Sequence, residues 1–180
     1  SQPGNSGFER DVMNGLVRLF VVLLAGVLVF LPPKGNLSNL GLPPAEGATR
    51  DGVAPDFVLE DLQGRQYRMS DYRGRPMFIV FGTTWCPMCR QEIPVYKEIY
   101  SRYGPKGLVV LYINVMESQR KAAAYATKHS LPYPVLVDTQ GKVTADYGVR
   151  GVPAKILVDR NGKIICWNCR SLDALLSKQF

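Results

Sequence analysis

The chain has 180 residues, of which 46% are hydrophobic and 21% charged, with a formal net charge of +7. This length suits one domain, or one domain with an appendage, and the composition excludes a disordered chain. Four cysteines are too few for a small disulfide-dependent domain, and the single histidine, His129, excludes most histidine-rich metal sites. The basic residues are scattered and no nucleic-acid motif accompanies them, so we expect no nucleic-acid partner.

The N-terminal region divides into three segments by composition. Residues 1–15 form a polar leader, and residues 16–31 contain an apolar run preceded by Arg18. This layout is typical of a signal peptide or an uncleaved signal anchor, with a buried core helix as the alternative. The positive-inside rule then places the remaining chain outside the cytoplasm. Residues 32–52 are rich in proline and glycine and are typical of a linker, which leaves residues 53–180 as the globular domain.

That domain alternates between predicted strands and helices. Apolar runs such as Met77–Phe81 are typical of strands buried on both faces, and Ser118 suits a helix N-cap. The pattern predicts an α/β fold with a mixed sheet flanked by helices. In chain order we expect a hairpin over 57–69, a strand over 77–81, a helix over 86–102, a strand over 108–115, a helix over 118–129, a strand over 135–137, a hairpin over 154–166 and a helix over 171–179.

The segment Trp85-Cys-Pro-Met-Cys89 carries the clearest chemistry. It lies at a predicted strand-to-helix junction, so Cys86 stands where unpaired N–H groups and the helix dipole favour a thiolate. Cys89 follows one helical turn later, close enough to form a small disulfide with Cys86. We therefore expect Cys86 to attack a partner disulfide and Cys89 to resolve the mixed disulfide.

These motifs resemble the TlpA/ResA branch of the thioredoxin-like superfamily, which contains membrane-tethered extracytoplasmic thiol-disulfide oxidoreductases. The resemblance implies a thioredoxin-like fold with an N-terminal β-hairpin extension. It is carried by Ala54-Pro-Asp-Phe-Val-Leu-Glu-Asp61, Leu62-Gln-Gly64, Ser70-Asp-Tyr-Arg-Gly74, Phe81-Gly-Thr-Thr-Trp-Cys-Pro-Met-Cys89, Glu92-Ile-Pro94, Asn114-Val-Met-Glu-Ser118 and Tyr147-Gly-Val-Arg-Gly-Val-Pro153.

The resemblance also implies roles for residues around the cysteines. Val152-Pro153 matches the family's cis-proline, whose preceding backbone pairs with the substrate. We also expect Trp85, which shields the reactive sulfur, to contact the substrate. Glu117 matches an acid that tunes or transfers the proton of the buried thiol, although a solvated loop carboxylate is the alternative. After Pro153 the family commonly has Thr, whereas this chain has Ala154-Lys155. Lys155 is either a cation near the site or a plain edge-strand charge, and we favour the edge-strand charge.

The function implied is reduction of protein disulfides, with apocytochrome c CxxCH segments as substrates and a membrane thiol-disulfide protein as electron donor. We expect a monomer on the periplasmic side of the inner membrane, held by its N-terminal anchor, with no organic cofactor and no metal. Pro87-Met88 between the cysteines leaves the direction open, so a general disulfide oxidant or isomerase is an alternative. A peroxidase is disfavoured because the Pro-x-x-x-Thr-x-x-Cys segment lacks its proline.

The second pair, Cys166-Trp-Asn-Cys169, is the least expected feature. If the closing hairpin is antiparallel, this pair lies at the same end of the sheet as Pro153 and Cys86. Three interpretations stay open: a second redox pair, a local structural disulfide or two inert thiols, and a metal-binding module of four cysteines formed with the first pair.

Overall fold

The computed structural model describes residues 52–180. The predicted leader, signal segment and almost all of the linker lie outside these residues. Within the described part, no helix is both long enough and apolar enough to cross a membrane.

The centre of the domain is a mixed sheet in the order β2-β1-β5-β4-β3-β6-β7. The neighbours β3, β4 and β5 run parallel, while β1, β2, β6 and β7 pair with their neighbours in antiparallel fashion. The strands are β1 (Val58–Asp61), β2 (Gln66–Arg68), β3 (Met77–Gly82), β4 (Val109–Val115), β5 (Val135–Asp138), β6 (Ala154–Val158) and β7 (Ile164–Trp167).

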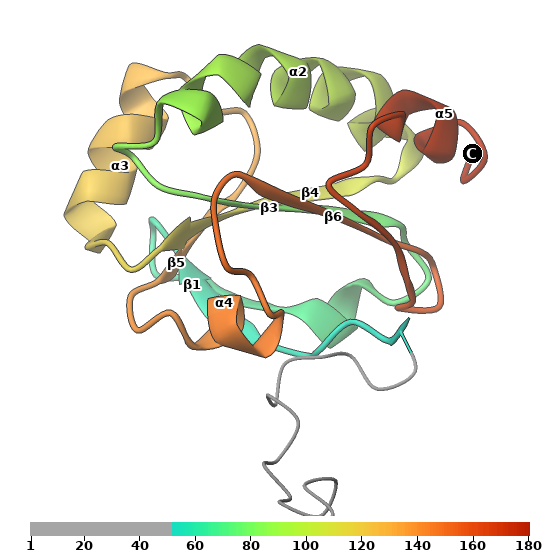
Figure 1. Ribbon diagram of the computed structural model, residues 1–180, viewed down its shortest axis with the longest axis horizontal. Coiled ribbons are helices and arrows are strands. Elements are labelled where there is room, and N and C mark those ends of the chain that lie inside the picture. The colour runs from blue at the N-terminus through green and yellow to red at the C-terminus, as the bar shows by residue number, and fades with distance from the viewer. Residues whose placement is uncertain (1–51) are drawn as a thin grey trace, which may run out of the picture. The chain divides into compact units, whose positions relative to one another are not determined.

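Helices cover both faces of the sheet. Figure 1 shows α2 (Pro87–Tyr103), α3 (Gln119–Lys128) and α5 (Leu172–Leu176) on one face and α4 (Lys142–Asp146) on the other. Short 3-10 turns lie at Met69–Tyr72 and Gly104–Lys106. Each face has its own apolar core, because β3 and β4 are buried along their whole length and send alternate side chains to opposite sides.

The predicted α/β architecture is confirmed, including the N-terminal β1-β2 hairpin and the closing β6-β7 hairpin. Ser118 caps α3 as expected, since its Oγ accepts a hydrogen bond from the N–H of Lys121 at 3.4 Å. Two details differ. The five-residue α4 was not predicted, and α5 is shorter than the predicted helix over 171–179.

The interpretation of Lys155 as an edge-strand charge is wrong. β6 lies between β3 and β7, so it is an interior strand. Lys155 of β6 pairs with Val80 of β3. Its side chain is only 22% exposed. An interior lysine of this kind needs a partner for its charge, and the partner lies on α2, as described below.

Candidate active site

Cys86 lies at the N-cap of α2, just beyond the end of β3. Its Sγ accepts a hydrogen bond from the backbone N–H of Cys89 at 3.1 Å, and Pro87 occupies the first turn, where a missing N–H costs nothing. The two cysteines form a disulfide with their Cα atoms 5.3 Å apart. Cys86 is 4% exposed and Cys89 is fully buried, so Cys86 is the sulfur that a partner reaches first.

A cis peptide bond joins Val152 to Pro153 directly opposite this sulfur. The carbonyl oxygen of Val152 lies 3.8 Å from the Sγ of Cys86, and Pro153 leads into β6, which pairs with β3. The predicted approach of Val152 and Pro153 to Cys86 is therefore present in the fold. This partly buried segment stands beside the reactive sulfur.

Glu117 anchors the loop that leads into Cys86. Its carboxylate accepts the backbone N–H of Thr84 at 2.7 Å, the hydroxyl of Thr84 at 2.6 Å and the side-chain amide of Asn114 at 2.9 Å. Burial alone would raise the pKa of Glu117, but the hydrogen bonds from Thr84 and Asn114 outweigh it and hold the pKa below its usual range. Glu117 is 8% exposed, so it is not a solvated loop carboxylate.

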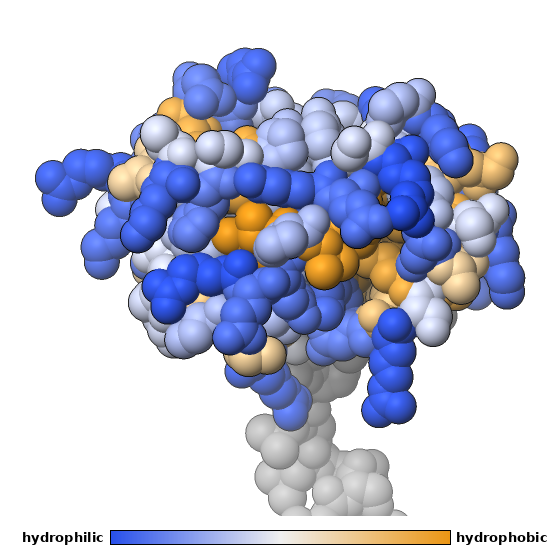
Figure 2. Space-filling view, turned by 90° about the horizontal axis from the view of Figure 1, so that it is seen from above, coloured by the Kyte–Doolittle hydropathy of each residue, from blue (hydrophilic) through white to orange (hydrophobic). Residues whose placement is uncertain are grey.

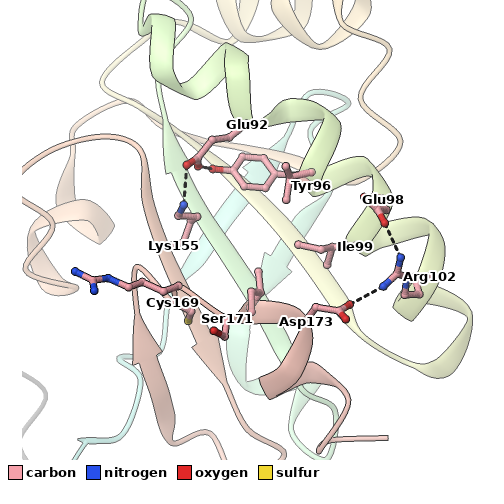
Figure 3. Close-up of a pocket in the computed structure, with 12 residues that line it drawn as sticks. Glu92, Tyr96, Glu98, Ile99, Arg102, Lys155, Cys169, Ser171 and Asp173 are labelled. Carbon is pink, nitrogen blue, oxygen red and sulfur yellow. Dashed lines mark hydrogen bonds and ion pairs between the residues drawn. The ribbon is translucent and has the colours of Figure 1, made fainter.

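An ion pair that the sequence did not reveal joins α2 to β6. The Nζ of Lys155 lies 2.7 Å from Oε1 of Glu92, and the other oxygen of Glu92 accepts a hydrogen bond from the hydroxyl of the buried Tyr96. Figure 3 shows Glu92 between these two partners. Burial, followed by the hydrogen bond to Glu92, raises the pKa of Tyr96. Glu92 follows Cys89 by three residues. Its place in the Glu92-Ile-Pro94 motif was the only feature of the sequence that pointed to a role for Glu92 near the cysteines.

Large apolar side chains near the site are exposed. Trp85 is 69% exposed and Met88 is 55% exposed, and both are immediate neighbours of the cysteines in sequence. Met116, which precedes Glu117, is 69% exposed as well. Exposed aromatic and methionine side chains of this size are typical of surfaces that contact another molecule.

Cys166 and Cys169 form a second disulfide, with their Cα atoms 5.7 Å apart. Cys166 is in β7 and Cys169 follows the strand at the same end of β6 as Pro153. Within residues 52–180 no three potential metal-ligating side chains are grouped closely enough to hold an ion.

Comparisons with known proteins agree with this geometry. The model of the AhpC/TSA family matches residues 51–166. Two proteins named thiol-disulfide oxidoreductase ResA are similar over 141 residues, which is 78% of this chain and 76% of each relative: those of Geobacillus thermodenitrificans, at 35% identity, and Geobacillus kaustophilus, at 40%. The chain belongs to the ResA-like thiol-disulfide oxidoreductases of the AhpC/TSA family.

A solved structure supports the same fold and chemistry. The chain is similar to a protein of Chlorobium tepidum described as the thiol:disulfide interchange protein DsbE, with a TM-score of 0.63 and 29% identity. The match covers 71% of this chain and 92% of that one. A thioredoxin-like oxidoreductase works by exchanging a dithiol for a disulfide, and Cys86–Cys89 at the start of α2 is the pair placed to do so.

Proposed function

We propose that this oxidoreductase reduces protein disulfides outside the cytoplasm, and that the CxxC segments of apocytochromes c are among its substrates. The observation that carries the proposal is the position of Cys86: a nearly buried sulfur at a helix N-cap, facing the cis Val152–Pro153 bond. A substrate disulfide presented on an extended segment would lie against this backbone and bring one sulfur to Cys86.

The exchange reaction follows from the different environments of Cys86 and Cys89. In the reduced enzyme the Cys86 thiolate, stabilised by the N–H of Cys89, attacks the substrate disulfide and displaces one substrate thiolate. The buried Cys89 then loses its proton and attacks Cys86 in the mixed disulfide, which releases the second substrate thiol. A dithiol protein anchored in the membrane would restore the reduced enzyme.

Three further residues have proposed roles in this reaction. Trp85 supplies the apolar surface on which a substrate rests, and Val152 supplies the backbone that pairs with it. Glu117 acts as the acid-base group for Cys89, and its hydrogen bonds to Thr84 already hold the loop that carries Cys86.

The direction of electron flow decides between a reductase and an oxidant or isomerase. Equilibration of Cys86–Cys89 with glutathione gives its reduction potential in a chain whose other two cysteines are serine. A potential well below about −220 mV supports the reductase, whereas a value of about −120 mV contradicts it. The substrate class is tested with an oxidised CxxCH peptide, which the reduced chain should reduce faster than a CxxCA peptide of the same length.

A further inference from the structure

A second disulfide borders an open groove that begins at the Glu92–Lys155 ion pair and that Cys86 and Cys89 do not line. The groove, about 490 Å³ in volume, lies between α2 and the segment that leads into α5. Val95 and Ile99 line it from α2, and Cys169 lines it from the opposite side. Figure 3 shows Cys169 between Lys155 and Ser171 at this groove, and Figure 2 shows a band of apolar surface edged by polar residues on the face seen from above.

Hydrogen bonds and strand pairing hold the Cys166–Cys169 turn in addition to the bridge. The N–H of Asn168 donates to the carbonyl oxygen of Lys155 at 2.7 Å, and the N–H of Lys155 donates to Oδ1 of Asn168 at 2.9 Å. Trp167 pairs with Ile156 in the sheet. Asn168 has φ of +46°, a left-handed conformation that asparagine tolerates better than most residues. A bridge across two intervening residues closes so short a loop that it adds little chain-entropy stabilisation, so stability is a weak explanation for it.

The second pair is also more accessible than the first. Cys166 and Cys169 are both partly exposed, whereas Cys86 and Cys89 are buried. Arg170 lines the groove next to Cys169, and no ion pair within residues 52–180 engages it. The other cations of the groove have partners: Lys155 pairs with Glu92, and Arg102 pairs with two carboxylates. An uncompensated guanidinium beside a disulfide attracts an incoming thiolate.

We propose that Cys166–Cys169 is a second redox-active disulfide, whose partner is a protein dithiol that approaches along the groove between α2 and α5. The proposal requires only the exchange chemistry of the family and does not depend on the substrate or direction proposed for Cys86–Cys89. It assigns two exchange sites to this end of the sheet.

The exchange balances as a two-electron transfer. A partner thiolate attacks Sγ of Cys169, the Cys166–Cys169 bond breaks, and Cys166 leaves as a thiolate that takes a proton from solvent. The partner's second thiol gives its proton to solvent and attacks the partner sulfur that is bound to Cys169. Cys169 then leaves as a thiolate and is protonated. The partner dithiol is oxidised to a disulfide, and the pair gains two electrons and two protons.

The test isolates the second pair in the full chain. The variant C86S/C89S, in its oxidised form, is mixed with reduced thioredoxin as the dithiol probe, and thiols are trapped by alkylation and located by mass spectrometry. We expect Cys166 and Cys169 to become alkylated together in the folded chain. Their rate should lie within about a hundredfold of that for Cys86–Cys89 in the variant C166S/C169S, because both are then exchange sites. A pair that stays oxidised until urea unfolds the chain would overturn the proposal.

Matched arginine variants test the entrance. Arg170→Gln in the C86S/C89S background should slow the reaction with thioredoxin about threefold or more and reduce its dependence on salt. Arg68→Gln, at the exposed opposite edge of the sheet on β2, should leave the rate unchanged. Equal rates for both variants would mean that the thiolate does not enter beside Arg170, and this part of the proposal would be rejected.

Discussion

Lys155 of β6 forms an ion pair with Glu92 of α2, with 2.7 Å between Nζ and Oε1, across 63 positions of sequence. Both side chains are largely buried, at 22% and 26% exposed. The pair joins the strand that follows the cis-proline to the helix that carries both active-site cysteines. Because Glu92 is one turn beyond Cys89, the charge on Lys155 compensates a carboxylate close to the reacting sulfurs.

Replacing Lys155 by methionine should weaken the nucleophile. Without the cation, the carboxylate of Glu92 faces the thiolate of the reduced site uncompensated, and like charges disfavour the ionised form. We expect iodoacetamide to alkylate Cys86 at neutral pH roughly threefold to tenfold more slowly in K155M. The measurement is the alkylation rate of the reduced protein, resolved for each cysteine.

The double variant K155M/E92Q is the control for that prediction. It removes both charges, so the alkylation rate of Cys86 should return toward the wild-type value. The variant K155R keeps the positive charge and should keep the wild-type rate. If K155M and K155M/E92Q are equally slow, packing of the lysine stem rather than its charge governs the site.

Replacing Glu117 by glutamine should destabilise the folded chain. The carboxylate of Glu117 accepts three hydrogen bonds through its two oxygens. The glutamine amide carries no charge and has only one oxygen that can accept. We expect a loss of about 1–3 kcal/mol in the free energy of unfolding at neutral pH. Urea denaturation of the wild type and E117Q measures this difference.

The difference in the free energy of unfolding between the wild type and E117Q should become smaller in acid. The folded-state pKa of Glu117 is lowered, so its stabilising contribution is complete above the ordinary carboxyl value of 4.5 and is lost as the pH falls through the lower folded value. The stability gap between wild type and E117Q should therefore close below pH 4.5. A gap that stays constant, or that widens in acid, would show that the Glu117 charge is not what stabilises the loop.

Gly82 at the end of β3 should tolerate no larger residue. A Cβ atom at this position would overlap the hydroxyl of Tyr112 and stand 2.6 Å from its Cζ, and Tyr112 is fully buried. We expect Gly82→Ala to cost about 1–3 kcal/mol by overpacking. Thermal unfolding should show partial rescue when Tyr112→Phe is added, because this change removes the closest atom. Equal stabilities for G82A and G82A/Y112F would contradict the clash.

The sequence predicted the parts of the fold that have strong local signals. The apolar runs of β3 and β4 indicated the buried strands, and the CxxC motif placed the start of α2 at Cys86. The helix α4 was missed because it has only five residues and buries one of them, Val143, which is too short for a helical period to show.

Contacts between distant segments could not be predicted from the sequence. Lys155 was misinterpreted because the predicted β6-β7 hairpin covers only one side of β6, and its pairing with the distant strand β3 on the other side is not encoded in a local pattern. Glu92 was visible only as part of a family motif, and its partner lies on another strand. Thr84 was overlooked for the same reason. Its role is to donate hydrogen bonds to Glu117, which follows β4 and is distant from Thr84 in sequence.

The central claim is that Cys86 attacks the disulfide of a substrate protein and that the buried Cys89 resolves the product. It is tested most directly by trapping with single-cysteine variants in the C166S/C169S background. The reduced C89S variant should accumulate a mixed disulfide between Cys86 and an oxidised CxxCH peptide, while the C86S variant should form little or none. Equal trapping through Cys89 in the C86S variant would contradict the account.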